Sequence, residues 1–184
     1  MKTIVSFSLV LMVALTTGSC QKTGFLTKYG IFHVEDDGTT VTMNGTIGGR
    51  TEKHWDNLVK DHPNVDRMVM GNCPGSKNDE VNLKVSKKIH DHGVHMHLNS
   101  DSEIASGAVD MFLAGTTRSI DSGAKVGVHS WSGDGVDNAA DLPQDDAQHQ
   151  MFLDYYVSIG MTEQESRDFY FFTLQAALPV TFIG

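Results

Sequence analysis

The sequence predicts an α/β fold: one domain with a mostly parallel sheet flanked by helices. Short runs of β-branched and aliphatic residues alternate with longer stretches of helical spacing, which is typical of strand–helix–strand units. The chain has 184 residues, of which 40% are hydrophobic and 20% charged, and this composition suits a globular domain with a sizeable core. Its 18 glycines and 4 prolines indicate turns between regular elements rather than a disordered or collagen-like chain.

The expected elements follow one another in a regular order. Two β-type runs, Ile31–Val34 and Thr40–Met43, flank an Asp-Gly pair that is typical of a hairpin loop. Apolar residues three and four apart then predict helices, and short aliphatic runs between turn residues predict strands. The remaining expectations, in chain order, are helix 51–61, strand 65–70, helix 79–92, strand 94–98, helix 104–114, strand 124–128, loop 131–144, and helices 147–160 and 163–178.

The first twenty residues are typical of a targeting segment. Lys2 is followed by an apolar run over residues 4–15, a small polar stretch and then Cys20. This layout predicts a secretory signal peptide over residues 1–19, and the run is too short to span a hydrocarbon core of ~30 Å. A cysteine at the cleavage point resembles the lipobox of bacterial lipoproteins, which implies a lipidated Cys20, a tether over residues 20–30 and a periplasmic protein anchored to a membrane. Ordinary cleavage near Ser19 and a secreted soluble protein are the alternative.

The balance of charge excludes one class of partner. The chain carries 14 Lys and Arg against 23 Asp and Glu, a net charge of −9, which phosphate backbones repel. We therefore expect no nucleic-acid partner, and membrane contact only through the lipid anchor. Two cysteines cannot build a disulfide framework. If Cys20 is lipidated, Cys73 is the one remaining free thiol, and we expect it to be a small buried residue under its turn.

Three short pieces of sequence together suggest acyl-transfer chemistry. Residues 73–76, Cys-Pro-Gly-Ser, form a tight turn after a strand, Ser106 stands among small residues where a helix begins, and His129 ends a strand. Acyl transfer needs a nucleophile, a base and N–H donors for the oxyanion. A serine at a helix N-terminus has free backbone N–H groups beside it, and a glycine turn on a neighbouring strand can supply another.

The order of these pieces resembles that of the Clp protease proteolytic subunit, in the superfamily that it shares with the crotonases. The family pattern runs Gly-x-Ile, Ser-Pro-Gly-Gly, Ala-Ser-Met-Gly-Ala, Gly and Ile-His-Gln. The corresponding stretches here are Gly45-Thr46-Ile47, Cys73-Pro74-Gly75-Ser76, Ala105-Ser106-Gly107-Ala108, Gly115 and Val128-His129-Ser130. The resemblance covers residues 45–131, is nearest to the exported members, and implies a spiral of β-β-α units in one domain over residues 31–184.

The resemblance implies a role for each of these residues. Ser106 would be the nucleophile and His129 the general base, and the oxyanion hole would be the N–H of Gly107 with that of Gly75 or Ser76. Ser76 stands where the family has a second glycine, so its β-carbon would clash if that site needs a positive φ.

The third catalytic member is less defined. The family's acid precedes a Leu-Ser/Thr-x-x-Glu-Ala stretch near the C-terminus, which residues 172–177 resemble. Asp168 is the first choice for it and Glu165 the second, although neither falls at the family's spacing. A dyad whose histidine is oriented by a backbone carbonyl is a further alternative.

The function expected from this site is that of an exported serine peptidase-like acyl hydrolase. Its substrate would be a peptide or an already unfolded segment, because no ATP pool exists outside the cytoplasm to drive an unfoldase, and it would need no cofactor. The alternative is a non-catalytic lipoprotein that keeps the fold as a binding or assembly module. A Ser–Lys dyad is disfavoured because no lysine follows Lys125. Ring assembly in the family uses a helix and strand that the acidic loop 131–146 replaces, so we expect a monomer or small homo-oligomer.

A metal centre is the remaining possibility that the sequence raises. Four histidines, His90, His92, His95 and His97, lie close together in the sequence, and imidazole is a common ligand for Zn, Cu and Ni. No cysteine or regular ligand spacing accompanies them, and histidine is favourable near a helix C-terminus. We therefore expect no metal site.

Overall fold

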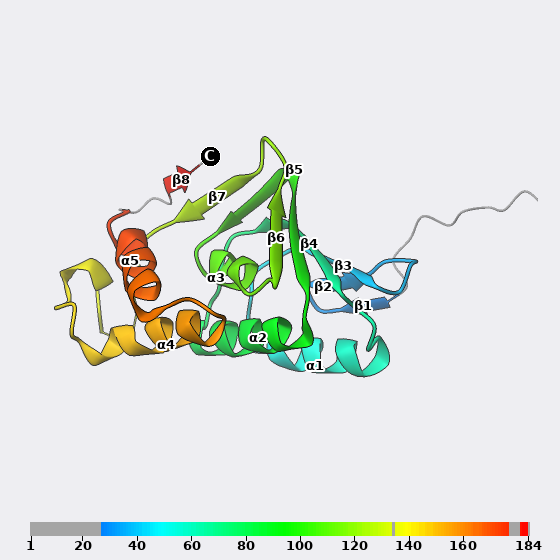
Figure 1. Ribbon diagram of the computed structural model, residues 1–184, viewed down its shortest axis with the longest axis horizontal. Helices are drawn as coiled ribbons and strands as arrows, with labels where there is room; N and C mark the ends of the chain where they lie inside the picture. The colour runs from blue at the N-terminus through cyan, green and yellow to red at the C-terminus, as the bar shows by residue number, and fades with distance from the viewer. Residues whose placement is uncertain (1–26, 134, 177–180, 184) are drawn as a thin grey trace, which may run out of the picture.

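The computed structural model describes residues 27–133, 135–176 and 181–183 of the chain (Figure 1). The expected signal peptide over residues 1–19 and the expected lipidation site Cys20 lie outside the described residues. Among the described helices, none is both long and apolar enough to cross a bilayer.

One mixed sheet of eight strands organises the domain. Its strand order is β1-β2-β3-β4-β5-β7-β8, with β6 also paired to β5. The pairings β3–β4, β4–β5, β5–β6 and β5–β7 are parallel, and β1–β2, β2–β3 and β7–β8 are antiparallel. The strands are β1 (Thr27–Tyr29), β2 (Phe32–Val34), β3 (Thr40–Met43), β4 (Arg67–Cys73), β5 (His95–Ala105), β6 (Thr117–Ile120), β7 (Lys125–Val128) and β8 (Thr181–Ile183).

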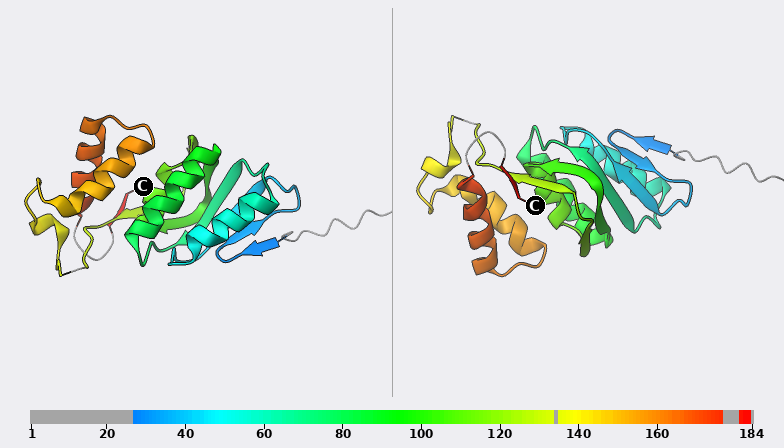
Figure 2. Two further views of the ribbon diagram at one scale, coloured as in Figure 1. Left: turned by 90° about the horizontal axis from the view of Figure 1, so that it is seen from below. Right: turned by 90° about the horizontal axis from the view of Figure 1, so that it is seen from above.

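Helices cover one face of this sheet and extend it at one end. Helices α1 (Thr51–Asp61) and α2 (Asp79–His92) lie side by side on one face, and the strands are open on the other (Figure 2). Helices α4 (Gln150–Ser158) and α5 (Glu163–Leu174) form a hairpin whose first helix packs against α2. The predicted α/β architecture, a mostly parallel sheet flanked by helices, is confirmed.

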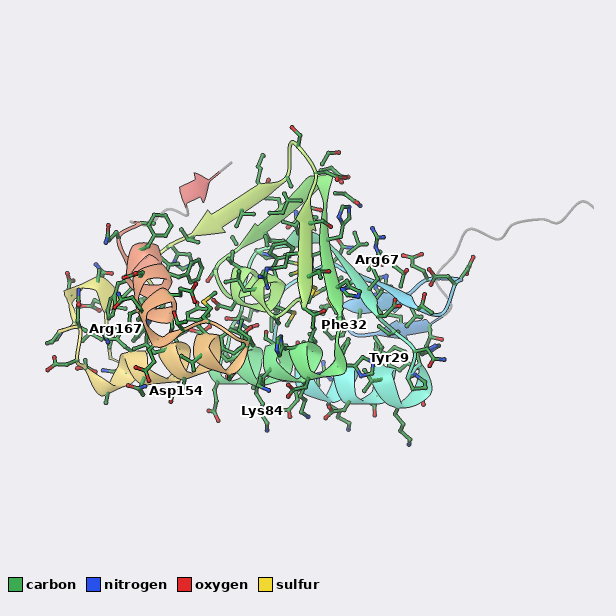
Figure 3. All side chains as sticks on the ribbon, in the orientation of Figure 1. Tyr29, Phe32, Arg67, Lys84, Asp154 and Arg167 are labelled. Atoms are coloured by element: carbon green, nitrogen blue, oxygen red, sulfur yellow. The ribbon has the colours of Figure 1, made fainter. Side chains whose placement is uncertain are left out.

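The core follows from the alternation of buried and exposed side chains along the strands. In β4 the side chains of Met68, Met70 and Cys73 point to the helical face and are fully buried, whereas Arg67 is exposed on the open face (Figure 3). The main cluster joins the sheet to α1, α2 and α3 (Gly107–Leu113). A second cluster, rich in aromatic residues, lies between α4 and α5, so the helical hairpin has a core of its own.

Several helix ends are fixed by side chains that the sequence provides. Asn78 accepts a hydrogen bond from the Val81 N–H at 2.8 Å and caps α2, whose last turn ends at Gly93 in the left-handed conformation. Thr162 and Glu165 form a capping box at the start of α5. These caps explain why α2 and α5 begin at the residues that the sequence predicts.

Several elements differ from the expectations. The helix expected from residue 147 begins as a 3₁₀ turn over Ala147–His149 and continues as α4 from Gln150. Strand β1 falls in the segment expected to be a tether, so the sheet begins before residue 31. The helix expected from residue 104 begins at Gly107, because β5 continues to Ala105. Strands β6 and β8 were not expected. Every residue of β6 is exposed, so it has no apolar alternation from which a strand could be predicted.

Candidate active site

Ser106 occupies a strained turn between a strand and a helix. Strand β5 ends at Ala105 and α3 begins at Gly107, and Ser106 between them has φ 53° and ψ −133°. It is the one non-glycine residue with positive φ among those the structure describes. Such a conformation costs about 1–3 kcal/mol and concentrates at active sites, and a strained strand-to-helix turn is how α/β-hydrolases expose their nucleophilic serine.

The surrounding backbone holds Ser106 in this conformation. Its N–H donates to the Gly127 carbonyl of β7 at 2.9 Å, and its own carbonyl accepts from the Val109 N–H at 2.7 Å. Both backbone groups of the serine are therefore satisfied by neighbouring elements, which leaves the hydroxyl free to face the adjacent cavity. The sequence prediction that Ser106 stands at a helix start is confirmed.

The glycine turn after β4 lies directly against the serine. Gly75 has φ 125°, and a β-carbon there would come within 2.8 Å of the Ser106 β-carbon, so only glycine fits. Ser76, in contrast, is not among the residues with positive φ, and its side chain is accommodated without the clash considered from the sequence. Its hydroxyl donates to the Asp79 carboxylate.

Ser76 contacts Gly107, the residue that follows Ser106. Ile47 bridges Ser76 in parallel register, donating to the Gly75 carbonyl and accepting from the Lys77 N–H, each at 2.9 Å. Because N–H groups of extended backbone alternate in direction, the Ser76 N–H points away from Ile47. A β-carbon on Gly107 would lie 2.5 Å from the Ser76 Oγ, so Ser76 and the Gly107 backbone are in contact. These are the two residues expected from the sequence to supply the oxyanion hole with N–H groups.

His129 follows strand β7 and lines the same cavity as Ser106. Its Nδ1 lies 2.7 Å from the Ser130 carbonyl oxygen. Because a carbonyl can only accept, this contact places the ring proton on Nδ1 and leaves Nε2 able to take a proton. The hydrogen bonds of the described residues do not join Ser106 to His129. Such bonds are often long in ligand-free enzymes and shorten when substrate binds.

The two acids expected to complete a triad lie elsewhere. Asp168 is exposed on α5 and accepts a hydrogen bond from Gln164 at 2.8 Å. Glu165 is exposed in the capping box at the start of α5, where its carboxylate accepts from Thr162. Neither lines the cavity, and no interaction of the described residues links either carboxylate to His129. The structure instead places a backbone carbonyl, that of Ser130, against His129 Nδ1, as in the dyad given as a further alternative from the sequence.

The cavity beside Ser106 is narrow and aromatic. Its volume is about 40 Å³, which is room for a few water molecules in this ligand-free form. Among the residues that line this cavity, His129 is present and no lysine is. The cavity therefore gives no support to a Ser–Lys dyad. The lining residues are Asp79, Ser106, Gly107, Val109, Asp110, Val128, His129, Trp131, Phe152, Tyr156, Phe169, Tyr170 and Thr173.

Sequence reasoning did not single out Asp110, which lies on α3 one turn after Ser106. The residue keeps 9% of its surface exposed, and the Tyr156 hydroxyl donates to its Oδ1 at 2.6 Å. Burial, and to a lesser degree the neighbouring charge of Asp79, raises the pKa of this carboxyl to about 7, although the Tyr156 hydrogen bond opposes the shift. The only signal in the sequence is one charged residue inside an otherwise apolar helix.

The remaining candidates are structural. Cys73 is fully buried, as expected, and burial raises the pKa of its thiol to about 12, so it is not a nucleophile. His95 and His97 bond through Nδ1 to Thr117 and Ser119 at 2.7 and 2.8 Å. Across the described ranges, no three His, Cys, Asp or Glu side chains are grouped so that they could hold a metal ion.

Comparison with known proteins finds partial matches among solved structures. No protein-family model matches the sequence, and no curated protein matches it. Two solved structures of the 1510-N membrane-bound stomatin-specific protease are similar, each with a TM-score of 0.47 over 70% of this chain. The first is a serine-to-alanine mutant (14% identity, 66% of its chain covered), and the second is a lysine-to-alanine mutant in complex with a substrate peptide (15% identity, 63% covered).

This chain thus spans less than two thirds of the second structure's length and just under two thirds of the first's. Nothing about substrates transfers at this level of similarity. Fold and site together define the class: an α/β protein with a serine on a strained strand-to-helix turn, a glycine turn packed against it, and a histidine at the end of the neighbouring strand.

Proposed function

We propose that the chain is a serine-type acyl hydrolase that acts on peptides or unfolded segments, with Ser106 as nucleophile and His129 as general base. The observation that carries this proposal is the conformation of Ser106. A positive φ at a non-glycine residue is destabilising and concentrates at active sites. It directs a hydroxyl into a cavity that already contains a histidine with a free Nε2.

The geometry supports a two-step reaction. The Ser106 Oγ attacks the substrate carbonyl carbon while His129 Nε2 accepts the hydroxyl proton, and the negative oxygen of the tetrahedral intermediate is held by the N–H groups of Gly107 and Ser76. The intermediate collapses by breaking the bond to the leaving amine, which takes the proton from His129. Water then attacks the acyl-serine ester, again with His129 as base, and releases the carboxylic acid and free Ser106.

The setting of this reaction belongs to the same proposal. With a signal peptide over residues 1–19 and a lipidated Cys20, the domain acts in the periplasm as a lipid-anchored protein. It needs no cofactor and no ATP-driven partner, so it accepts chains that are already unfolded. It works as a monomer or small homo-oligomer.

The test is covalent labelling by a fluorophosphonate probe, read by intact-protein mass spectrometry. Wild type should gain one adduct, and Ser106→Ala should gain none. Ser122→Ala is the matched control, because Ser122 is exposed in the turn before β7 and should label like wild type. His129→Ala should label more slowly by at least about 10²-fold, the usual share of a general base.

Two results would contradict the proposal. Labelling that survives in Ser106→Ala would place the nucleophile elsewhere. A wild type that is folded by circular dichroism but does not label would favour the non-catalytic binding or assembly module.

A further inference from the structure

Two carboxylates face the cavity next to Ser106, and neither has a cationic partner. Asp79, from the first turn of α2, and Asp110, from α3, both line the cavity. The ion pairs of the described residues join Lys or His side chains to other acids. None of these ion pairs includes Asp79 or Asp110. Both acids thus lack a direct ion pair among the described residues, although Lys77 lines the adjoining groove together with Asp79.

The hydrogen bonds to Asp110 neutralise its charge only in part. Tyr156 donates a neutral hydroxyl to Oδ1 at 2.6 Å, and Asn82 reaches Oδ2 at 3.5 Å, the long limit of a hydrogen bond. A buried carboxylate without a cation is costly, and it is stabilised when one arrives. The raised pKa of Asp110 has a related cause, because burial disfavours the charged form of this carboxyl.

The rest of the lining also suits a cation. Trp131, Phe152, Tyr156, Phe169 and Tyr170 form the walls of the cavity. The faces of aromatic rings attract ammonium and guanidinium groups, more strongly where water is excluded. Aromatic walls with carboxylates among them are the combination that recognises a long alkyl chain ending in a positive charge.

The cavity also has a route of access. A larger groove of about 430 Å³ shares Asp79 and Trp131 with it and continues past Ser76 to Met151 at the start of α4. A substrate chain lying in this groove passes the Ser76 N–H, and the side chain next to its reacting carbonyl faces the cavity. The cavity volume of about 40 Å³ is smaller than a lysine side chain, so the aromatic walls must separate when that side chain enters.

We propose that Asp110, assisted by Asp79, selects substrates with a lysine- or arginine-like cationic side chain on the acyl side of the bond that Ser106 attacks. This inference rests on the proposed function and names its substrate class. Asp110 touches the bound side chain and not the reacting atoms, so it determines specificity. A charge-assisted hydrogen bond contributes about 1.5–3 kcal/mol, which corresponds to a preference of about 10- to 100-fold over a neutral side chain of the same length.

The experiment compares two diphenyl phosphonates that differ in one group. One carries the lysine side chain and the other the isosteric, neutral norleucine side chain. In both, Ser106 Oγ bonds to phosphorus and displaces phenoxide, which takes the serine proton by way of His129. The second-order rate constant of adduct formation is measured by mass spectrometry, so no natural substrate is needed.

The wild type should react at least about tenfold faster with the lysine probe than with the norleucine probe. Asp110→Asn, which keeps the shape and an acceptor for Tyr156, should bring the ratio close to one, and Asp79→Asn should lower it by a smaller factor. Asp154→Asn is the matched control: Asp154 is exposed on α4 (Figure 3) and bonded to Gln150 at 2.7 Å, so the ratio should equal that of wild type. If Asp110→Asn fails to fold, the ratio of the lysine-probe to the norleucine-probe rate constant in wild type still tests the preference for a cationic side chain.

The outcomes separate this inference from the proposed function. If fluorophosphonate labels Ser106 but the norleucine probe reacts as fast as the lysine probe, or neither phosphonate reacts, the inference is overturned and the hydrolase stands. If Asp110→Asn keeps the wild-type preference, Asp110 is not the selecting residue and the inference is also overturned. If no probe labels Ser106, the proposed function fails and this inference fails with it.

Discussion

Replacing Asp110 by asparagine should change how the stability of the fold depends on pH. The pKa of this carboxyl rises from its ordinary value of 3.8 to about 7 in the folded chain, because burial penalises its charge. Between those two values the unfolded chain has released the proton and the folded chain still holds it. The unfolded state then binds fewer protons, so the free energy of unfolding falls as the pH rises.

The magnitude follows from the two pKa values. A shift of about three units corresponds to about 4 kcal/mol of stability lost once both states are ionised, and about 2 to 3 kcal/mol of that loss falls between pH 5 and pH 8. Asparagine does not titrate, so Asp110→Asn removes this loss. The difference in unfolding free energy, variant minus wild type, should therefore become more positive by about 2 to 3 kcal/mol from pH 5 to pH 8.

Urea unfolding followed by circular dichroism at the two pH values measures this difference. Titrating groups that do not interact with Asp110 are common to both proteins and cancel. Asp154→Asn serves as the control, because the exposed Asp154 carboxylate should give a difference that does not change with pH. If the difference in unfolding free energy for Asp110→Asn were also independent of pH, the pKa of Asp110 would not be raised by folding. The reasoning about its burial would then be refuted.

Further predictions concern the turns at Ser106 and Gly75, the aromatic cluster around Tyr170, and Asp168, the acid that lies away from His129. Ser106→Gly should raise the free energy of unfolding by about 1 kcal/mol, because glycine accepts a positive φ without strain; urea unfolding measures this, and unchanged stability would argue against strain. Gly75→Ala should slow fluorophosphonate labelling at least about tenfold, since its β-carbon would meet Ser106 at 2.8 Å; labelling at the wild-type rate would show that the turn is free to move. Tyr170→Phe should destabilise the fold by about 1–3 kcal/mol, because the Trp131 N–H that now donates to it at 2.8 Å loses its acceptor; a smaller change in urea unfolding would mean that water replaces the hydroxyl. Asp168→Asn should label at the wild-type rate, whereas a large loss would restore Asp168 as a catalytic acid.

Much of the fold could be predicted because its signals are local. The helices α1 and α2 begin and end at the residues expected from apolar spacing, and in the structure Asn78 and Gly93 cap the two ends of α2. The hairpin of β2 and β3 follows from its Asp-Gly loop. Strand β6 could not be predicted, because it forms only by pairing with the first half of β5, and its own residues carry no alternation.

Part of the candidate site could also be predicted from local sequence, and part could not. Ser106, His129, Gly75, Ser76 and Gly107 could be proposed from short motifs, because each must stand where a strand or turn ends. The orienting partner of His129 could not, because a backbone carbonyl has no sequence signature; the structure supplies it from Ser130.

The sequence by itself thus determined the fold class, the central strands and helices and the residues of the serine turn, since these depend on periodicity and on the special geometry of glycine. Only the tertiary structure decided which side chains share a cavity. Asp79 and Asp110 come from different helices, and Tyr156 from a third, and they meet because α4 packs against α2. Charge and burial at that meeting point depend on packing between distant segments, and local sequence does not encode them.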